Sequence, residues 1–132
     1  MQVRFTGNWL PSLEFIRAVE YGLHALCLEN YKGDLLIEKV DQEGVLGDAI
    51  FDGVDEFHIR VTSEDLATIF HELVHVMQFA NYELEVYDEG HGYWKGETLE
   101  GLTYENSPWE IEAHHIEQVL LKCFELHRQK SS

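Results

Sequence analysis

The chain has 132 residues, of which 25 are acidic and 9 are basic, so its formal net charge at pH 7 is −16. This length is typical of one domain spanning residues 1–132, and a hydrophobic content of 45% with 12% aromatic residues argues against disorder. So acidic a chain repels phosphate backbones, which disfavours direct nucleic-acid binding, and no apolar run is long enough to span a membrane.

The first half of the chain predicts a helix followed by a small sheet. Residues 11–29 carry apolar side chains at helical spacing, and Pro11 suits a first-turn position. Three short segments with strand character follow, and the pieces DQEG and DGVD separate them as hairpin turns would. These segments are residues 34–40, 45–51 and 56–62. In the last of them apolar and polar side chains alternate, which indicates a strand with one buried face.

The second half predicts two helices joined by an irregular segment. A helix over residues 63–82 follows Thr62 or Ser63 as its N-cap. Residues 83–106 lack a helical period and are rich in Gly, Tyr and Trp, which indicates a loop or irregular hairpin. Ser107 then begins a helix that runs to about residue 128, with Pro first and Glu third as in a capping box. The order predicts an α+β fold: helix, small antiparallel-containing sheet, helix, loop and helix.

The chemistry-bearing motif lies in the helix over residues 63–82. His71, Glu72 and His75 form an HExxH string, in which the two imidazoles share one helix face and can reach one metal ion. Glu72 is placed to take a proton from a metal-bound water. The opposite face of the helix is apolar, so we expect it to cover the sheet while the two imidazoles face a cleft.

A catalytic zinc site needs a third protein ligand, and the last helix offers two carboxylates. Glu110 stands at the capping-box position, so the helix start already explains it. Glu112 projects between Val119 and Cys123 within the predicted apolar stripe of this helix, where an unpaired carboxylate is costly and a metal ion would remove that cost. The stripe consists of Trp109, Ala113, Ile116, Val119, Leu120 and Cys123. Periodicity therefore favours Glu112 over Glu110 as the third ligand.

The matching pieces, FHELVHVMQ and the Glu112-Ala113 pair, resemble a minimal gluzincin-type zinc metallopeptidase over about residues 57–124. Small bacterial and phage metallopeptidase-like proteins look similar. The resemblance implies a zincin-like fold in which His71, His75 and Glu112 bind Zn²⁺ and Glu72 is the base. The metzincin pattern does not fit, because Gln78 stands where those enzymes have Gly.

Several other side chains compete for roles at such a site. His91 is a candidate ligand, as in SprT-type enzymes, or a donor to the transition state, and Tyr87, Tyr93 and Tyr104 are alternative donors. Two further histidines lie near the third-ligand candidates: His114 is expected in solvent, and His115 lies at the edge of the stripe. Thermolysin-like enzymes carry an Asp four residues after the ligand Glu. Here that position is Ile116, so the groups that orient the ligand histidines must differ.

The expected function is hydrolysis of peptide bonds by a metal-activated water with Glu72 as general base, on a protein or peptide substrate. The alternative is a weak or inactive zincin-fold module that binds metal or a partner. A protease acting on basic, DNA-associated proteins fits the charge only through its substrate. Cys27 and Cys123 fall on apolar helical faces and are expected to be buried free thiols in the cytoplasm. The sequence leaves the oligomeric state open.

Overall fold

The computed structural model describes residues 1–41, 44, 46–88, 91–103 and 106–131. Its first sheet has the strand order β1-β2-β4-β3, in which β1 (Gln2–Thr6), β2 (Asp34–Lys39) and β4 (Glu56–Val61) run parallel. The edge strand β3 (Gly47–Phe51) pairs antiparallel with β4. The mixed α+β class predicted from the sequence is confirmed.

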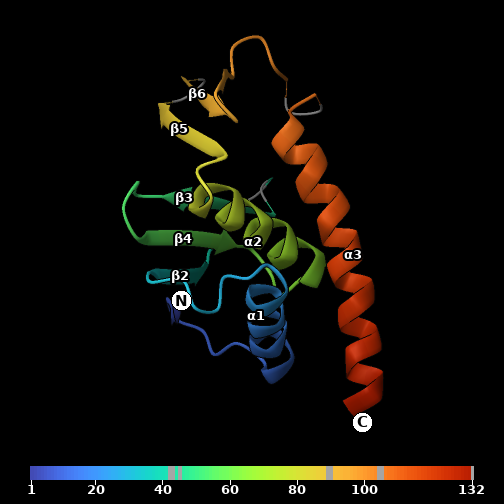
Figure 1. Cartoon of the computed structure of the whole chain (residues 1–132). Helices are drawn as coiled ribbons and strands as arrows, with labels where there is room; N and C mark the ends of the chain where they lie inside the picture. Colours follow the sequence, from blue (N-terminus) through green and yellow to red (C-terminus); the bar gives the residue numbers. More distant parts are fainter. Residues whose placement is uncertain (42–43, 45, 89–90, 104–105, 132) are drawn as a thin grey trace.

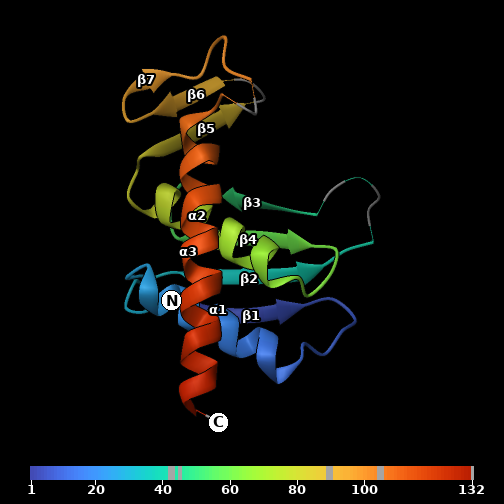
Figure 2. The ribbon, with the colours of Figure 1, turned by 90° about the vertical axis from the view of Figure 1, so that its right-hand side faces the viewer.

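The sheet is the first of three stacked layers. Helices α1 (Leu13–Ala25) and α2 (Leu66–Ala80) cover one of its faces, and the long helix α3 (Pro108–Ser131) runs along their outer side (Figures 1 and 2). Because α2 lies between the sheet and α3, 12 of its 15 residues are buried, on its polar face as well as its apolar one. The face expected to border an open cleft is therefore largely covered by α3.

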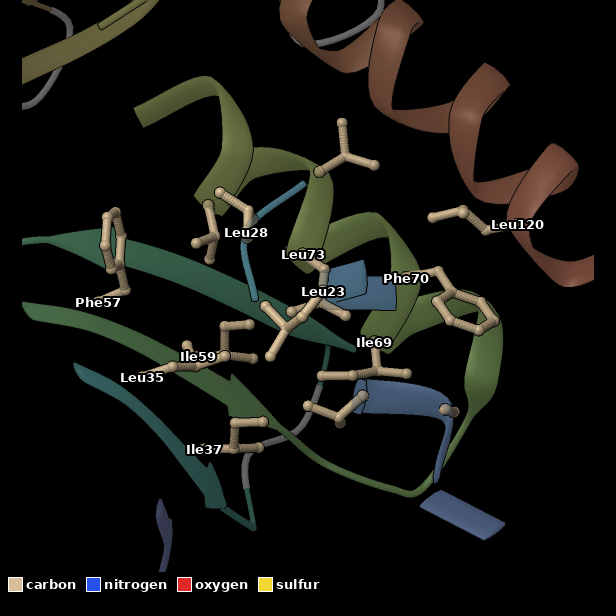
Figure 3. Close-up of a cluster of buried hydrophobic side chains, with 14 of the residues drawn as sticks. Leu23, Leu28, Leu35, Ile37, Phe57, Ile59, Ile69, Phe70, Leu73 and Leu120 are labelled. Atoms are coloured by element: carbon tan, nitrogen blue, oxygen red, sulfur yellow. The ribbon is translucent and has the colours of Figure 1, made fainter. Parts of the chain in front are cut away.

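The hydrophobic core lies between the sheet and the two inner helices (Figure 3). Alternation along β4 buries Phe57, Ile59 and Val61, as predicted, and β2 contributes Leu35 and Ile37 beside them. The helices add a second set of fully or almost fully buried side chains: Phe15, Ala18, Val19, Leu23, Ile69, Phe70, Leu73 and Val76. This core holds α2 in a fixed orientation against the sheet. The polar face of α2 is thereby turned towards α3.

A second, three-stranded sheet stands at one end of α2 and α3 (Figure 1). It consists of β5 (Leu84–Asp88), β6 (His91–Trp94) and β7 (Glu97–Thr98), all antiparallel, with a register irregularity between Val86 and Asp88. Residues 83–106 were expected to be a loop or an irregular hairpin, and the hairpin interpretation is confirmed. None of the described helices has the length and apolarity needed to cross a membrane.

One prediction about the sheet is wrong, and one strand was missed. The segments at 34–40 and 45–51 do not form a hairpin, because β3 passes beyond β4 to the edge and β2 pairs with β4 instead. The strand β1 was not predicted at all. Its short QVRFT sequence adds a parallel edge through the β1-α1-β2 crossover, and pairing of that kind leaves no local turn signal.

Helix ends and cysteines also differ from expectation. The N-cap of α2 is Asp65, whose carboxylate accepts from Thr68 N at 3.1 Å and from Thr68 Oγ1 at 2.7 Å, so neither Thr62 nor Ser63 begins the helix. Cys27 and Cys123 are free, as predicted, but both are exposed. Cys27 lies outside α1, just after the Leu26 cap, with φ of 60°, and Cys123 lies on the outer side of α3.

Candidate metal centre

Helix α2 places the two histidines of the motif side by side and buried. His71 and His75, one helical turn apart, have ring centroids 4.8 Å apart and rings at 84° to one another. Their residues are 7% and 8% exposed, so both imidazoles are largely withdrawn from water in the contact between α2 and α3. Buried imidazoles need partners for both ring nitrogens, and α3 supplies several of them.

The first turn of α3 brings Glu110 to both histidines. Its Oε2 lies 3.4 Å from His71 Nε2, and its Oε1 is in direct contact with His75 Nε2. The carboxylate is almost fully buried, with its side chain 8% exposed. The structure thus brings Glu110 to the pair, although the sequence interpretation had explained Glu110 as part of a capping box.

Glu112, favoured from the sequence as third ligand, lies elsewhere. Its Oε1 accepts from Gln78 Nε2 at 3.0 Å, and the residue is partly exposed. The predicted apolar stripe of α3 was out of phase, because Val119 and Cys123, the members of the stripe on either side of Glu112, are exposed. The buried face of α3 consists of Glu110, Ala113, Glu117, Leu120 and Phe124. Two of these five are carboxylates, so an argument that counted only apolar residues could not find this face.

Glu117, two turns after Glu110, holds the other side of His71. Its Oε1 lies 2.8 Å from His71 Nδ1 and 3.2 Å from Nδ1 of His114, whose side chain is 58% exposed. Burial acts to lower the pKa of His71, but its contacts with Glu110 and Glu117 outweigh that effect and raise the pKa to about 9. The signal for Glu117 in the sequence was its spacing of seven residues from Glu110, which places both carboxylates on one face of a helix.

Glu72 lies beside the two histidines and is 6% exposed. Burial raises the pKa of its carboxyl to about 7, while the nearby His75 and His71 act to lower it. The carboxyl lines a pocket of about 260 Å³ together with both histidines and Glu110. The other lining residues are Gly47, Asp48, Ala49, Phe79, Leu84, Val86 and Trp109.

Strand β3 forms one wall of this pocket and approaches α2 closely at Gly47. A Cβ at this position would lie 2.9 Å from Thr68 Cγ2 and 3.4 Å from Glu72 Cγ, so a larger residue would push against the helix. Next to it, the Asp48 carboxylate forms a bidentate pair with Arg60 on β4. The wall beside Glu72 is therefore formed by backbone, because residue 47 has no side chain.

The donor set of this pocket fits a divalent transition metal. Two imidazole nitrogens and one carboxylate are ligands that zinc takes, with bonds of about 2.0–2.2 Å. Two such ligands on one tetrahedral ion lie roughly 3.4 Å apart, which matches the 3.4 Å between His71 Nε2 and Glu110 Oε2. Entry of an ion would require the direct contact between His75 and Glu110 to open.

A second grouping shares two of these residues. His71, Glu110 and His114 each offer a ligand atom within 4.8 Å of the other two. His75 is the better third member, because it is buried and its Nε2 meets Glu110, whereas His114 is largely exposed and directs Nδ1 to Glu117. A ligand exposed to water also has to be ordered when the ion binds, and a buried one is already in place.

The other candidate residues from the sequence are not among the described residues that line the pocket. His91, Tyr87 and Tyr93 are exposed on the second sheet, where the two tyrosine rings contact one another with centroids 6.2 Å apart. His115 is exposed on α3. Tyr104 lies outside the described residues. No protein-family model, curated protein or solved structure matches the chain.

Proposed function

We propose that this chain is a zinc-dependent metallopeptidase of zincin-like fold, in which His71, His75 and Glu110 hold the ion and Glu72 is the general base. The observation that carries the proposal is the position of Glu110. It reaches Nε2 of both motif histidines inside the pocket that Glu72 lines. With His71 and His75, Glu110 gives the three protein ligands typical of a catalytic zinc site. It takes the place that the sequence had assigned to Glu112.

A bound zinc ion supplies two effects: it lowers the pKa of a water ligand to ~7 and polarises a substrate carbonyl. The chain's own groups perform the proton transfers. The Glu72 carboxylate takes the proton from the attacking water and delivers it to the nitrogen of the leaving amine. The buried setting of Glu72 keeps bulk water from competing for that proton, and the apolar wall of Phe79, Leu84 and Trp109 shields the same space.

The experiment compares wild-type protein with Glu72→Gln, using a quenched fluorescent peptide library with and without chelator. The variant is expected to bind zinc with wild-type stoichiometry and to lose at least 100-fold in hydrolysis, within the range of a lost general base. Hydrolysis that survives in Glu72→Gln would contradict the mechanism. A matched control is Glu97→Gln, an exposed carboxylate on β7.

A second function has its own support. The pocket, at about 260 Å³, is smaller than the ≈ 300–1,000 Å³ typical of ligand sites, and a metal held there without turnover would give a binding module. The same library separates the two functions. A protein that binds zinc stoichiometrically and cleaves none of the peptides is the binding module.

A further inference from the structure

Gln78 is fully buried on α2, three residues after His75, and all its polar atoms have partners. Its Nε2 lies 2.9 Å from the backbone oxygen of Trp109 and 3.0 Å from Glu112 Oε1. Its Oε1 lies 2.7 Å from His75 Nδ1. A single side chain thus connects a motif histidine to two groups at the start of α3.

These contacts determine the orientation of the amide. The Trp109 carbonyl can only accept, and so can an ionised Glu112 carboxylate, so the group facing them must be the NH₂ of Gln78, which has two hydrogens to donate. Turning the amide over would place its oxygen against two acceptors, and each polar atom that is left buried without a partner costs about 1–3 kcal/mol. The oxygen of Gln78 therefore faces His75.

The orientation of the amide fixes the proton on His75. An amide oxygen cannot donate, so Nδ1 of His75 must carry the hydrogen of the 2.7 Å contact. The other nitrogen, Nε2, is the atom directed at Glu110 and the pocket. We infer that Gln78 and Glu112 form a relay that holds the proton of His75 on Nδ1 and so reserves Nε2 for the metal ion.

This relay deepens the proposed function and rests on it only for the metal readout. It also assigns a role to Glu112 other than ligand. The charged carboxylate strengthens the hydrogen bond from the amide and makes the reversed orientation unfavourable. Gln78 and Glu112 are positioning residues, because both act on the ion only through His75. His71 is held differently, by the Glu117 carboxylate on its Nδ1.

The first readout is the tautomer of His75, measured from imidazole ¹⁵N chemical shifts with chelator and with zinc. Wild-type protein is expected to show a protonated Nδ1 in both conditions. Gln78→Met, which keeps the side-chain length and removes the acceptor, is expected to lose that preference in the metal-free protein. Gln2→Met, on the exposed start of β1, is the matched control. An unprotonated Nδ1 in the wild type would overturn the relay whether or not zinc binds.

The second readout is the zinc dissociation constant, measured by competition with a chromogenic chelator. Groups that orient ligand histidines typically contribute about 10–100-fold to metal affinity, and Gln78→Met is expected to weaken binding by that factor. Glu112→Gln keeps an oxygen that can accept from Gln78 and is expected to stay within about threefold of wild type, whereas Glu112→Leu loses about tenfold. Circular dichroism of each variant checks that the fold is retained.

The outcomes distinguish the relay from the metal site itself. If both Gln78→Met and Glu112→Leu bound zinc with wild-type affinity, the relay would be overturned. If Gln78→Met does not fold, the zinc affinity of Glu112→Leu alone decides whether the relay stands. A loss above 100-fold in Glu112→Gln, with little loss in Glu110→Gln, would make Glu112 the ligand and also overturn it. A wild-type protein that binds no zinc would refute the proposed function, and the tautomer measurement would still decide the relay.

Discussion

Metal-free protein is expected to lose stability as pH rises, because two buried groups of the site hold their protons more tightly when folded. The pKa of Glu72 is about 7 in the folded chain against 4.5 for an ordinary Glu. The pKa of His71 is about 9 against 6.5. Both folded pKa values are raised, so the folded state binds more protons than the unfolded state, and stability falls with pH.

The size of the effect follows from the shifts. Each is about 2.5 pKa units, which corresponds to about 3 kcal/mol per group at 1.36 kcal/mol per unit. The contribution of Glu72 is lost between about pH 4.5 and 7, and that of His71 between about pH 6.5 and 9. Against a total stability of about 5–15 kcal/mol, the two losses together are large.

The assay is urea unfolding with chelator at pH 5, 7 and 9, in wild type and Glu72→Gln. The variant is expected to gain about 2.5 kcal/mol relative to wild type between pH 5 and 9, because it has no carboxyl to deprotonate and part of the wild-type loss has already occurred by pH 5. Glu97→Gln, with the same charge change at an exposed site, corrects for general repulsion in a chain of charge −16. If the free energies of unfolding of wild type and Glu72→Gln changed with pH by the same amount, the reasoning would be refuted.

Three further predictions concern Glu117, Gly47 and the two cysteines. Glu117→Leu removes the carboxylate that contacts His71 Nδ1 and is expected to weaken zinc binding by about 10–100-fold in chelator competition. Glu117→Gln keeps an oxygen that can accept from Nδ1, so a zinc affinity no better than that of Glu117→Leu would contradict a hydrogen-bonding role. Gly47→Ala places a Cβ 2.9 Å from a side chain of α2, so the free energy of unfolding should fall by about 1–3 kcal/mol, and an unchanged value in urea would show that β3 is not held there. Cys27 and Cys123 are exposed, so a colorimetric thiol reagent should modify both in the native protein, and protection of either would contradict its described position.

Elements with a strong local pattern could be predicted from the sequence, and pairings between distant strands could not. The alternation of Phe57, Ile59 and Val61 located β4, and Ser107-Pro108 located the start of α3 to the residue. The parallel pairing of β2 with β4 depends on the crossing of β3 to the sheet edge. No spacing in the intervening segment indicates that crossing.

The same distinction holds at the site. The HExxH spacing lies within one helix, so the adjacency of His71 and His75 follows from helix geometry alone. The partner on α3 depends on how two helices pack, and there the apolar-stripe rule failed because the buried face contains Glu110 and Glu117. Polar residues on a buried helix face are uncommon unless they are paired, so periodicity read from apolar residues alone shifted the face by about one residue.

The polar contacts between α2 and α3 explain why a metal ion would matter to folding as well as to chemistry. Glu110, Glu117 and Gln78 connect the two helices through the motif histidines, and every described buried side-chain nitrogen and oxygen has a partner. Without an ion, the contacts of His71 with Glu110 and Glu117 depend on its proton, which is released as pH rises, and Glu72 beside them becomes a buried charge over the same rise. An ion on the same nitrogens and carboxylate supplies positive charge that does not titrate, and at 100 times its dissociation constant it adds about 2.7 kcal/mol. Zinc should therefore stabilise the protein most at high pH, where the proton-held contacts are weakest, and this pH dependence distinguishes a metal at this site from one bound to the acidic surface.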